Sequence, residues 1–272
     1  MSDLSPSSAS GEGARGLHFV QSLERGLAVI KAFDADNPAM TLSDVARVTG
    51  MTRAAARRFL LTLADLGYVR SDGRLFMLTP RVLDLGFAYL SAAGLPAVAQ
   101  PHMEALVADV RHTCSVAVLD GDDVVYIARV AVRRIVNVAI AVGTRFPAYA
   151  TSLGRVLLAA KPDAWIEEYL QRVSITPLTH RMIDDTVRLR AELERVRATG
   201  HCLTDQELET GLRSISVPLR GPGGVVVAAM NLSVHAGFEA LEAMEEVLLP
   251  KLRAAADAVE GDLLARRDVQ HS

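Results

Sequence analysis

Cysteines are scarce in this sequence, and their spacing excludes two kinds of fold. Only Cys114 and Cys202 occur among 272 residues, and there is no Cys-x-x-Cys pair. A disulfide scaffold or a structural zinc module needs more thiols than this. His112 stands near Cys114, but one such pair offers too few ligands for a metal. We therefore expect no metal or cofactor, and two buried cysteines in a reducing compartment.

Long apolar runs are also missing. No stretch reaches the roughly 20 apolar residues that are needed to cross a bilayer. Residues 1–16 are rich in Ser, Ala and Gly and contain no apolar signal core. The sequence therefore predicts a cytoplasmic protein without a membrane partner, and a disordered tail over residues 1–16.

Net charge is small, but its distribution is uneven. The whole chain carries -3, whereas residues 41–81 contain seven arginines and three acidic residues, so this segment carries +4 and the remainder -7. A basic segment on an acidic body is typical of a protein that binds DNA at one site. Half of the residues are hydrophobic, which is enough for the cores of two modest domains.

The basic segment has the pattern of two helices joined by a turn. Thr41 and Asp44 have the spacing of a capping box, and Gly50 suits the end of the first helix. Thr52 can cap a second helix, and a hairpin of residues 67–78 follows as a wing. The apolar positions of the second helix are Ala56, Phe59, Leu60, Leu63 and Leu66. Together these signals predict a winged helix-turn-helix.

The outward side of the second helix combines small side chains with arginines. Small residues allow a close approach to base edges, and Arg can bind a guanine edge or a phosphate. Two short helices with a glycine between them also occur in proteins that never touch DNA, but the basic face and the arginine-bearing hairpin favour double-stranded DNA as the partner. The predicted DNA contacts are Ser43, Thr52, Arg53, Ala54, Arg57, Arg58, Arg70 and Arg74.

The remaining segments complete two domains. A helix with apolar residues at Val20, Leu23, Leu27, Ile30 and Phe33 is expected to pack behind the two helices. A linker helix over residues 80–94 has a surplus of apolar positions, which predicts contact with a second subunit. Residues 95–268 contain predicted strands at 115–119, 124–128, 135–142, 214–219 and 225–233, and helices at 97–110, 152–160, 163–173, 186–199 and 238–264. Residues 17–79 therefore form the winged domain, and residues 95–268 an α+β domain.

Three segments taken together resemble the isocitrate-lyase-regulator (IclR) family of bacterial transcription factors. They are the winged helix-turn-helix at residues 41–80, the run at 147–159 and the run at 205–215, and the match covers residues 17–266. Within the family, residues 128–135 and 143–147 look most like the subgroup that regulates the protocatechuate and β-ketoadipate branch of aromatic-acid breakdown. The alternative is a regulator of the same family that serves another catabolic pathway and responds to a different small effector. The resemblance implies a DNA-binding domain, a linker helix, an effector-binding domain at residues 95–268, and homodimers that often pair into homotetramers.

The effector is expected to be a small aromatic or dicarboxylic acid. Thr151 and Ser152 precede an apolar helical run, so the positive end of that helix favours an anion, unless the two hydroxyls only cap the helix. Asp205 cannot itself favour a carboxylate, so it is expected to brace its loop or to accept a proton-bearing group of the ligand. The resemblance implies an effector site built from Ala150, Thr151, Ser152, Gly154, Thr204, Asp205, Glu207, Leu212, Ser214, Met230, Asn231 and Ser233, with positive charge from Arg133, Arg134 or Arg145.

Two other classes of protein compete with a regulator as interpretations of the sequence. An enzyme is disfavoured because no glycine-x-serine-x-glycine elbow surrounds Ser152, and because the glycines at 221–224 suit a hairpin turn better than a phosphate-binding loop. A DNA-packaging protein without an effector would not need an acidic α+β domain of this length. The sequence therefore predicts a transcriptional regulator and no enzymatic activity.

Overall fold

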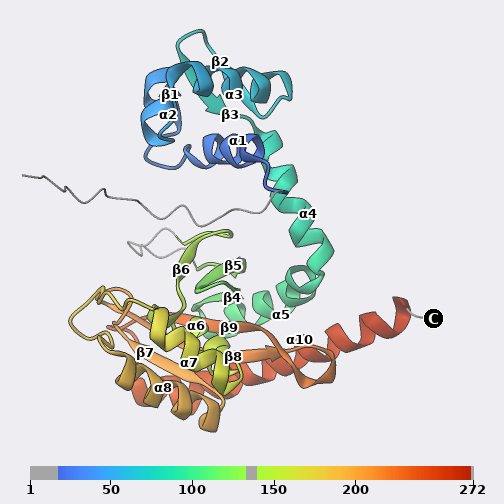
Figure 1. Cartoon of the computed structure of the whole chain (residues 1–272). Helices are drawn as coiled ribbons and strands as arrows, with labels where there is room; N and C mark the ends of the chain where they lie inside the picture. The colour runs from blue at the N-terminus through green and yellow to red at the C-terminus, as the bar shows by residue number, and fades with distance from the viewer. Residues whose placement is uncertain (1–17, 133–139, 271–272) are drawn as a thin grey trace, which may run out of the picture. The chain divides into compact units, whose positions relative to one another are not determined.

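The computed structural model describes residues 18–132 and 140–270, which form two compact units (Figure 1). The first unit ends at Tyr89 and the second begins at Leu90. None of the helices in these described ranges is long and apolar enough to cross a membrane.

The first unit is a winged helix-turn-helix, as the sequence predicts. Its elements are α1 (Gln21–Lys31), β1 (Ala39–Thr41), α2 (Leu42–Val48), α3 (Arg53–Asp65), β2 (Val69–Ser71) and β3 (Leu75–Leu78). β3 lies between β1 and β2 in an antiparallel sheet. The sequence does not predict β1, because three residues are too few to show the alternation of a strand.

The helix ends use the residues that the sequence indicates. The Asp44 N–H donates to Thr41 Oγ1 at 3.3 Å, and the Thr41 N–H donates to the Asp44 carboxylate at 3.2 Å. Gly50 follows α2 with φ of 66°, a conformation that an L side chain rarely adopts. Thr52 Oγ1 then accepts a hydrogen bond from the Ala55 N–H at 3.2 Å and caps α3. These local predictions are confirmed.

The core of the first unit is built from both sides of the turn. Val29, Val45, Ala56 and Leu60 are fully buried. Leu66, which the sequence places in this core, is 52% exposed. That prediction is wrong because Leu66 is the C-cap of α3, where the helical spacing that orients the other leucines ends.

α1 presents a different face to the core from the one expected. It packs through Val29, with Ala32 and Phe33 just beyond its end, whereas Val20, Leu23 and Leu27 are 57%, 63% and 43% exposed. Phe33 is therefore confirmed as a core residue, and these three are not. A stripe of apolar side chains on α1 remains at the surface.

The second unit is α+β, with helices on both faces of one sheet. A 3₁₀ turn (Pro80–Val82) leads into α4 (Leu83–Ala93), which crosses from the first unit into the second. The other helices of this unit are α5 (Leu95–Val110), α6 (Ser152–Ala159), α7 (Asp163–Arg172), α8 (Thr186–Thr199), α9 (Leu241–Ala243) and α10 (Leu249–Gln270). Its strands are β4 (Thr113–Asp120), β5 (Asp123–Val130), β6 (Arg145–Pro147), β7 (Cys202–Asp205), β8 (Leu212–Arg220) and β9 (Val226–His235).

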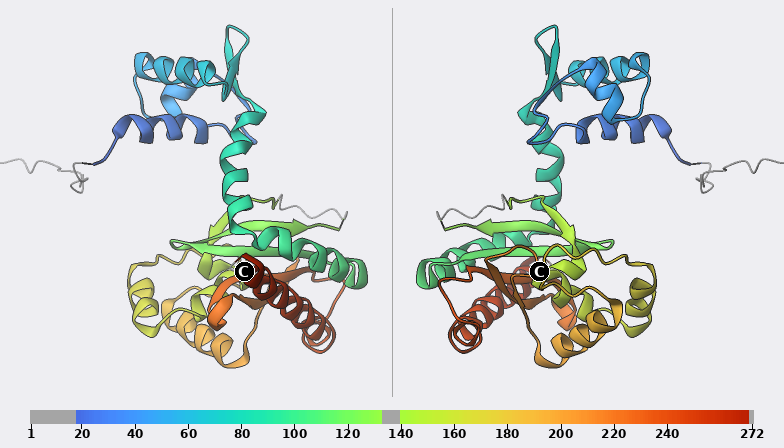
Figure 2. Two further views of the ribbon diagram at one scale, coloured as in Figure 1. Left: turned by 90° about the vertical axis from the view of Figure 1, so that its right-hand side faces the viewer. Right: turned by 90° about the vertical axis from the view of Figure 1, so that its left-hand side faces the viewer.

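The sheet of the second unit is antiparallel and has the order β6-β5-β4-β9-β8-β7. One face packs on α5 and α10, which lie against each other (Figure 2). The other face packs on α6, α7 and α8. Because side chains alternate between the faces of a strand, neighbouring residues of β4 and β9 belong to different cores.

Three predicted elements differ from the structure. The last helix begins at Leu241 rather than at residue 238, contains a π-helical turn (Met244–Leu248) and continues to Gln270. Residues 135–139 of the predicted strand 135–142 lie outside the described residues, and residues 140–142 are not in a strand. β6 and β7 are short edge strands that the sequence does not reveal.

Candidate functional site

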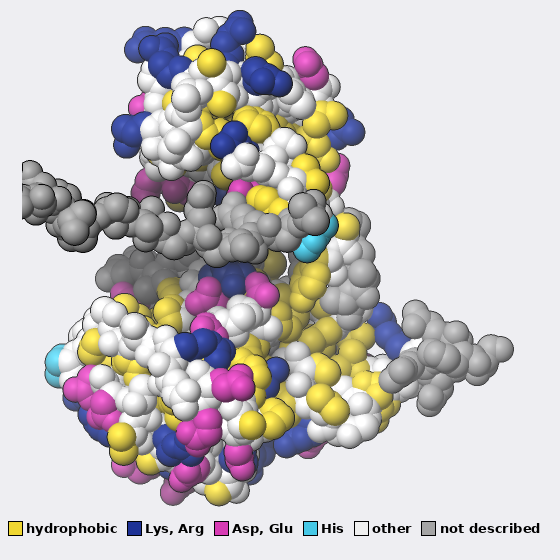
Figure 3. All heavy atoms as spheres, in the orientation of Figure 1, with side chains coloured by type: hydrophobic (Ala, Val, Ile, Leu, Met, Phe, Trp, Pro, Cys, Tyr) yellow, Lys and Arg dark blue, Asp and Glu magenta, His cyan; other side chains and the backbone are white. Residues whose placement is uncertain are grey.

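The outward face of α3 is exposed and basic. Arg53, Ala54, Arg57 and Arg58 are all exposed, and within the described residues none of the three arginines forms an ion pair. Basic side chains gather over α2, α3 and β2 in the space-filling view (Figure 3). These guanidinium groups are available to phosphates or base edges.

The wing presents two more arginines on a rigid turn. Arg70 lies on β2 and Arg74 in the turn, and both are exposed. The Asp72 carboxylate accepts the N–H groups of Leu75 at 2.8 Å and Arg74 at 2.9 Å, and these bonds hold the pKa of Asp72 below its ordinary value. The carboxylate is therefore ionised at neutral pH and can accept both bonds within the turn.

The N-terminal turn of α2 adds an exposed hydroxyl. Ser43 lies in the first turn of α2 and is exposed. Arg47, near the end of α2, is 3.6 Å from the Asp44 carboxylate. The eight residues predicted to contact DNA thus all lie in the first unit, on α2, α3 and the wing, with the side chain of Thr52 occupied as a cap.

A line of polar side chains crosses the sheet of the second unit. Arg129 of β5 pairs with Ser115 of β4, which pairs with Asn231 of β9, which pairs with Ser216 of β8. Because paired residues point to the same face, these four side chains form one row, here called the polar row. Its face is the one covered by α6, since Ser216 Oγ donates to Ser152 Oγ at 2.7 Å.

A buried network joins the polar row to the start of α6. Ser152 Oγ donates to Ser214 Oγ at 2.8 Å, and Asn231 Nδ2 donates to the same Ser214 oxygen at 2.7 Å. Asn231 Nδ2 also donates to Ser233 Oγ at 3.1 Å, and Asn231 Oδ1 accepts the Ser115 N–H at 3.1 Å. The structure therefore brings together Ser152, Ser214, Asn231 and Ser233, which are far apart in the sequence.

The residues before α6 are held by local contacts. Thr151 Oγ1 accepts the Gly154 N–H at 2.9 Å, so this hydroxyl caps the helix. Ala150 is buried in the 3₁₀ turn Ala148–Ala150. A Cβ on Gly154 would lie 2.0 Å from the carbonyl oxygen of Ala148, which no real Cβ tolerates. Gly154 thus permits the turn to lie against α6.

Arg155 forms a buried ion pair that the sequence does not predict. The guanidinium is 1% exposed and donates to the two carboxylate oxygens of Glu207 at 2.9 and 2.5 Å, and to the Tyr149 carbonyl at 2.9 Å. Burial alone would lower the pKa of Arg155, but the bonds from Glu207 raise it above its ordinary value. Glu207, predicted to bind the effector, instead neutralises a buried cation.

Asp205 is likewise engaged by arginines. Its carboxylate accepts from Arg213 Nε at 2.6 Å and pairs with Arg181. Partial burial raises the pKa of Asp205, but the bonds from Arg213 and Gln206 lower it below its ordinary value. These contacts with Arg213 and Arg181 are consistent with the prediction that Asp205 braces the loop between β7 and β8.

Two predicted residues lie near the network, and one lies on the wrong face. Thr204 Oγ1 is 3.4 Å from the Ser214 carbonyl, and Leu212 begins β8 on the same face as Ser214. Met230 is fully buried in the core beneath α5 and α10. Its assignment to the effector site is wrong, because it adjoins Asn231 in β9 and therefore points to the opposite face.

Of the three arginines predicted to supply positive charge to the effector, the structure describes one. Arg133 and Arg134 lie outside the described residues. Arg145 donates to Asp120 at 2.7 Å and to Asp123 at 3.3 Å, so its charge is balanced at the β4–β5 turn. It does not join the polar row.

Arg129 is the cation that sequence reasoning missed. It is partly buried, its Nη1 donates to Ser115 Oγ at 3.3 Å, and no carboxylate in the described part of the chain pairs with it. Burial lowers the pKa of this guanidinium, as expected for a cation without a counter-charge. The sequence does show a single arginine directly after the apolar run 124–128. It does not show that residues of β4 and β9 lie beside this arginine, because the register of the sheet decides those contacts.

The side chains of this region lack an activated nucleophile among the residues that the structure describes. Ser152 bonds there to two other serine hydroxyls and to no general base, and burial raises the pKa of both Cys114 and Cys202 to about 12. Both thiols are therefore protonated at neutral pH, which confirms them as buried hydrophobic side chains. An unpaired guanidinium beside hydroxyl and amide groups can bind a small anion with a defined orientation.

The chain is similar to known regulators over most of its length. It is 46% identical over 238 residues to the Pca regulon regulatory protein of Pseudomonas putida, covering 87% of this chain and 82% of that protein. It is 36% identical over 253 residues to the p-hydroxybenzoate hydroxylase transcriptional activator of Acinetobacter baylyi, covering 91% and 93%.

A solved structure agrees with both units. An IclR homolog complexed with 4-hydroxybenzoate, from Microbacterium hydrocarbonoxydans, has a TM-score of 0.80 and 28% identity, with 90% of this chain and 99% of that chain covered. The IclR helix-turn-helix domain matches residues 22–73, and the C-terminal domain of the bacterial transcriptional regulator IclR matches residues 87–260. With both domains matched in this order, the chain belongs to the IclR family of bacterial transcriptional regulators.

Proposed function

We propose that this regulator binds operator DNA and controls genes of aromatic-acid breakdown, in response to a small aromatic or dicarboxylic acid. Its similarity to the Pca regulon regulatory protein and to the p-hydroxybenzoate hydroxylase transcriptional activator supports this assignment. The site of its action is the cytoplasm, where the DNA is found. Residues 17–79 serve as the DNA-binding domain, 80–94 as the linker helix and 95–268 as the effector-binding domain.

DNA is bound by the basic face of the first unit. Arg53, Arg57 and Arg58 reach the major groove from α3, and Arg70 and Arg74 of the wing contact the backbone. Ser43, Thr52 and Ala54 complete the contact surface, with the small side chain of Ala54 allowing the helix close to the bases. The support for this role is the exposure of these side chains and the lack of ion pairs to the arginines within the described residues.

The effector is held at the open end of the polar row. Ser152, Ser214 and Asn231 are buried and satisfy one another, whereas Arg129 and Ser233 are only partly buried. The carboxylate of the effector pairs with Arg129, and Ser233 and Ser115 accept or donate hydrogen bonds beside it. The positions of Arg129, Ser233 and Ser115 are then fixed by the residues around them, which are Ser214, Ser152, Asn231 and Thr204. The observation that carries this proposal is the partly buried guanidinium of Arg129 with no carboxylate partner among the described residues.

Titration calorimetry tests the effector and its anchor. Protocatechuate, 4-hydroxybenzoate and β-ketoadipate are titrated into the wild-type protein and into Arg129→Gln. One acid is expected to bind the wild type, and Arg129→Gln should weaken its binding by about 1.5–3 kcal/mol, the range for loss of a hydrogen bond to a charged group.

Arg145→Gln is the matched control, because Arg145 is an arginine of the adjacent strand that is already paired with Asp120 and Asp123. It should leave the affinity unchanged. If none of the acids binds, the assignment to aromatic-acid breakdown fails. If one binds equally well to Arg129→Gln, the anchor is misplaced.

The protein acts as a homodimer or as a pair of dimers. The first half of α4 supports this, since Leu83, Leu85 and Tyr89 are 72%, 50% and 54% exposed. Large apolar side chains that are exposed on a helix, with Leu85 and Tyr89 one turn apart on the same face, favour burial against another subunit. Light scattering at micromolar concentration should report a dimer or tetramer, and a monomer that still binds operator DNA would contradict the proposal.

A further inference from the structure

A hollow lies between α1 and the turn that joins α2 to α3. It has a volume of about 460 Å³. α1 contributes Glu24, Arg25 and Ala28 to its lining, the turn contributes residues 49–52, and α3 contributes Ala55. Because residue 52 is the N-cap of α3, the hollow lies beside the end of the helix that is proposed to enter the major groove. None of the arginines assigned to DNA so far lines it.

Arg25 brings a positive charge to this hollow. Its side chain is exposed, and its guanidinium forms no ion pair or hydrogen bond with the residues that the structure describes. Arg47, in the same unit, is in contrast 3.6 Å from the Asp44 carboxylate. The N–H donors of Arg25 are therefore available to an anion.

Thr52 adds a hydroxyl donor from the turn. Its Oγ1 accepts the Ala55 N–H at 3.2 Å, which leaves the hydroxyl proton available to an acceptor. The other hydroxyl of the turn is committed, since Thr49 Oγ1 donates to the Val45 carbonyl at 2.6 Å. The hollow thus offers a guanidinium and a hydroxyl, and both are groups that bind phosphate oxygens in protein–DNA complexes.

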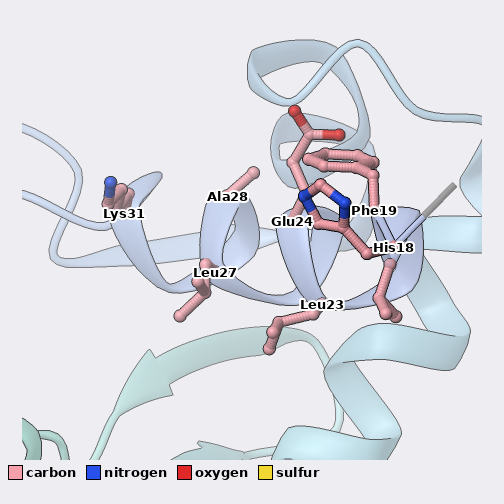
Figure 4. Close-up of a pocket in the computed structure, with 8 residues that line it drawn as sticks. His18, Phe19, Leu23, Glu24, Leu27, Ala28 and Lys31 are labelled. Carbon is pink, nitrogen blue, oxygen red and sulfur yellow. The ribbon is translucent and has the colours of Figure 1, made fainter. Parts of the chain in front are cut away.

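Glu24 decides which kind of phosphate fits. This acidic residue lines the hollow beside Arg25, and it also lines a second hollow on α1 together with His18 and Phe19. Figure 4 shows Glu24 on the same edge of α1 as Ala28. The neighbouring acid opposes the charge of Arg25, so a free phosphate ion gains little here. A phosphate of a duplex is held in place by the other contacts of the unit, and for it one further donor pair adds affinity.

We propose that this hollow receives a backbone phosphate of the operator, bound by Arg25 and Thr52, at the edge of the groove that α3 enters. Helices outside the recognition helix commonly contact the backbone in this way. A phosphate carries no sequence information, so Arg25 adds affinity and positions α3 without reading a base. The inference rests on the proposed DNA-binding function and extends its contact surface to α1.

Salt-dependent DNA binding of the full chain tests the contact. The probes are a duplex that the wild-type protein selects from random sequences and a scrambled duplex of the same length. Arg25→Gln should weaken binding to both duplexes by the same factor. It should also reduce the slope of log K against log salt by about one unit for each bound copy of the chain.

Two further variants control for charge and folding. Lys31→Gln is the matched control, because Lys31 is an exposed cation of the same helix that lines the other hollow, and it should leave the slope unchanged. Arg25→Lys keeps the charge and should retain the wild-type slope. A slope that Lys31→Gln lowers as much as Arg25→Gln does, or that Arg25→Lys fails to retain, overturns the contact.

Ethylation interference then locates the phosphate. Ethylation removes the charge of one phosphate at a time, and one position that blocks binding of the wild type should lose its effect with Arg25→Gln, while the other positions keep theirs. Identical patterns for the two proteins contradict this inference alone. A wild-type protein that binds neither duplex would contradict the proposed function instead.

Discussion

At the scale of single residues, the arginines of the two units differ in whether acidic side chains pair with them. On α3, Arg53, Arg57 and Arg58 have no acidic partners among the described residues. In the second unit, Arg155 and Arg213 are tied to Glu207 and Asp205. An unpaired arginine at the surface is available to bind a ligand. A buried arginine that is paired with a carboxylate has a structural role instead, because breaking the pair would leave an uncompensated charge in the interior.

Replacing one of the α3 arginines should affect DNA binding in a way that identifies its contact. If Arg57 meets a phosphate, Arg57→Ala lowers affinity for all sequences and reduces the slope of log K against log salt by about one unit. If it reads a base, specificity relaxes by about 1–3 kcal/mol at one position. Binding isotherms at several salt concentrations distinguish the two cases. Arg188→Ala, in the second unit, is the control, and unchanged isotherms for both Arg57→Ala and Arg58→Ala would exclude this face.

The pairing of Asp205 predicts a pH dependence. Its folded-state pKa lies below the unfolded value of about 3.9, so the stability it contributes is complete above that value and is lost as the pH falls through the folded-state pKa. Asp205→Asn should lower the free energy of unfolding at pH 7 by about 0.5–1 kcal/mol. Urea denaturation should show this difference shrinking below about pH 4. Asp184→Asn, which disturbs only an exposed pair with Arg188, should show a smaller difference.

At the scale of elements, α6 is the part of the second unit on which most contacts converge. Its first residues carry the hydroxyl of Ser152 and the cap of Thr151, and its middle carries Arg155. All eight residues of the helix are buried. A helix enclosed in this way cannot shift without disturbing the polar row.

Gly154 should therefore be intolerant of the smallest side chain. Gly154→Ala would place a Cβ 2.0 Å from the Ala148 oxygen and 2.5 Å from its Cα, both backbone atoms. We expect a loss of stability of several kcal/mol or failure to fold, measured by thermal melting. Gly261→Ala is the matched control, because this helical glycine of α10 has nothing within 4 Å of the added Cβ, and its replacement should stabilise by about 0.5–1 kcal/mol. Equal melting temperatures for the two variants would show that the turn before α6 can move.

At the scale of the whole molecule, the chain combines a DNA-binding unit with a larger unit that has its own sheet and two cores. Regulation requires that a ligand of one unit alter binding by the other. In thermodynamic terms this is a coupling free energy, and it is reciprocal.

Coupling can be measured directly. A saturating amount of the acid found by calorimetry should change the affinity for operator DNA by a factor of about 5–150, and DNA should change the affinity for the acid by the same factor. Fluorescence anisotropy with labelled DNA measures the first and calorimetry in the presence of DNA the second. Arg129→Gln should abolish both effects together. A factor of one for the wild type would show that the bound acid does not regulate DNA binding.

Local signals in the sequence determined much of this protein. The cap at Thr41, the glycine at position 50 and the helical spacing of α3 depend on residues within a few positions of one another, so they could be read directly. The two buried cysteines and the β4–β5 hairpin were predicted for the same reason. The IclR family followed from segments that lie intact in the chain.

Tertiary structure alone decided which side chains meet and which faces stay exposed. The row from Arg129 to Ser216 depends on the order and register of β5, β4, β9 and β8, which long-range contacts set and spacing along the chain does not encode. The same register placed Met230 on the opposite face, and the burial of Arg155 against Glu207 joins residues 52 positions apart. The stripe on α1 has helical spacing that identifies an apolar face, but only the packing of Val29 into the core revealed that Val20, Leu23 and Leu27 stay exposed.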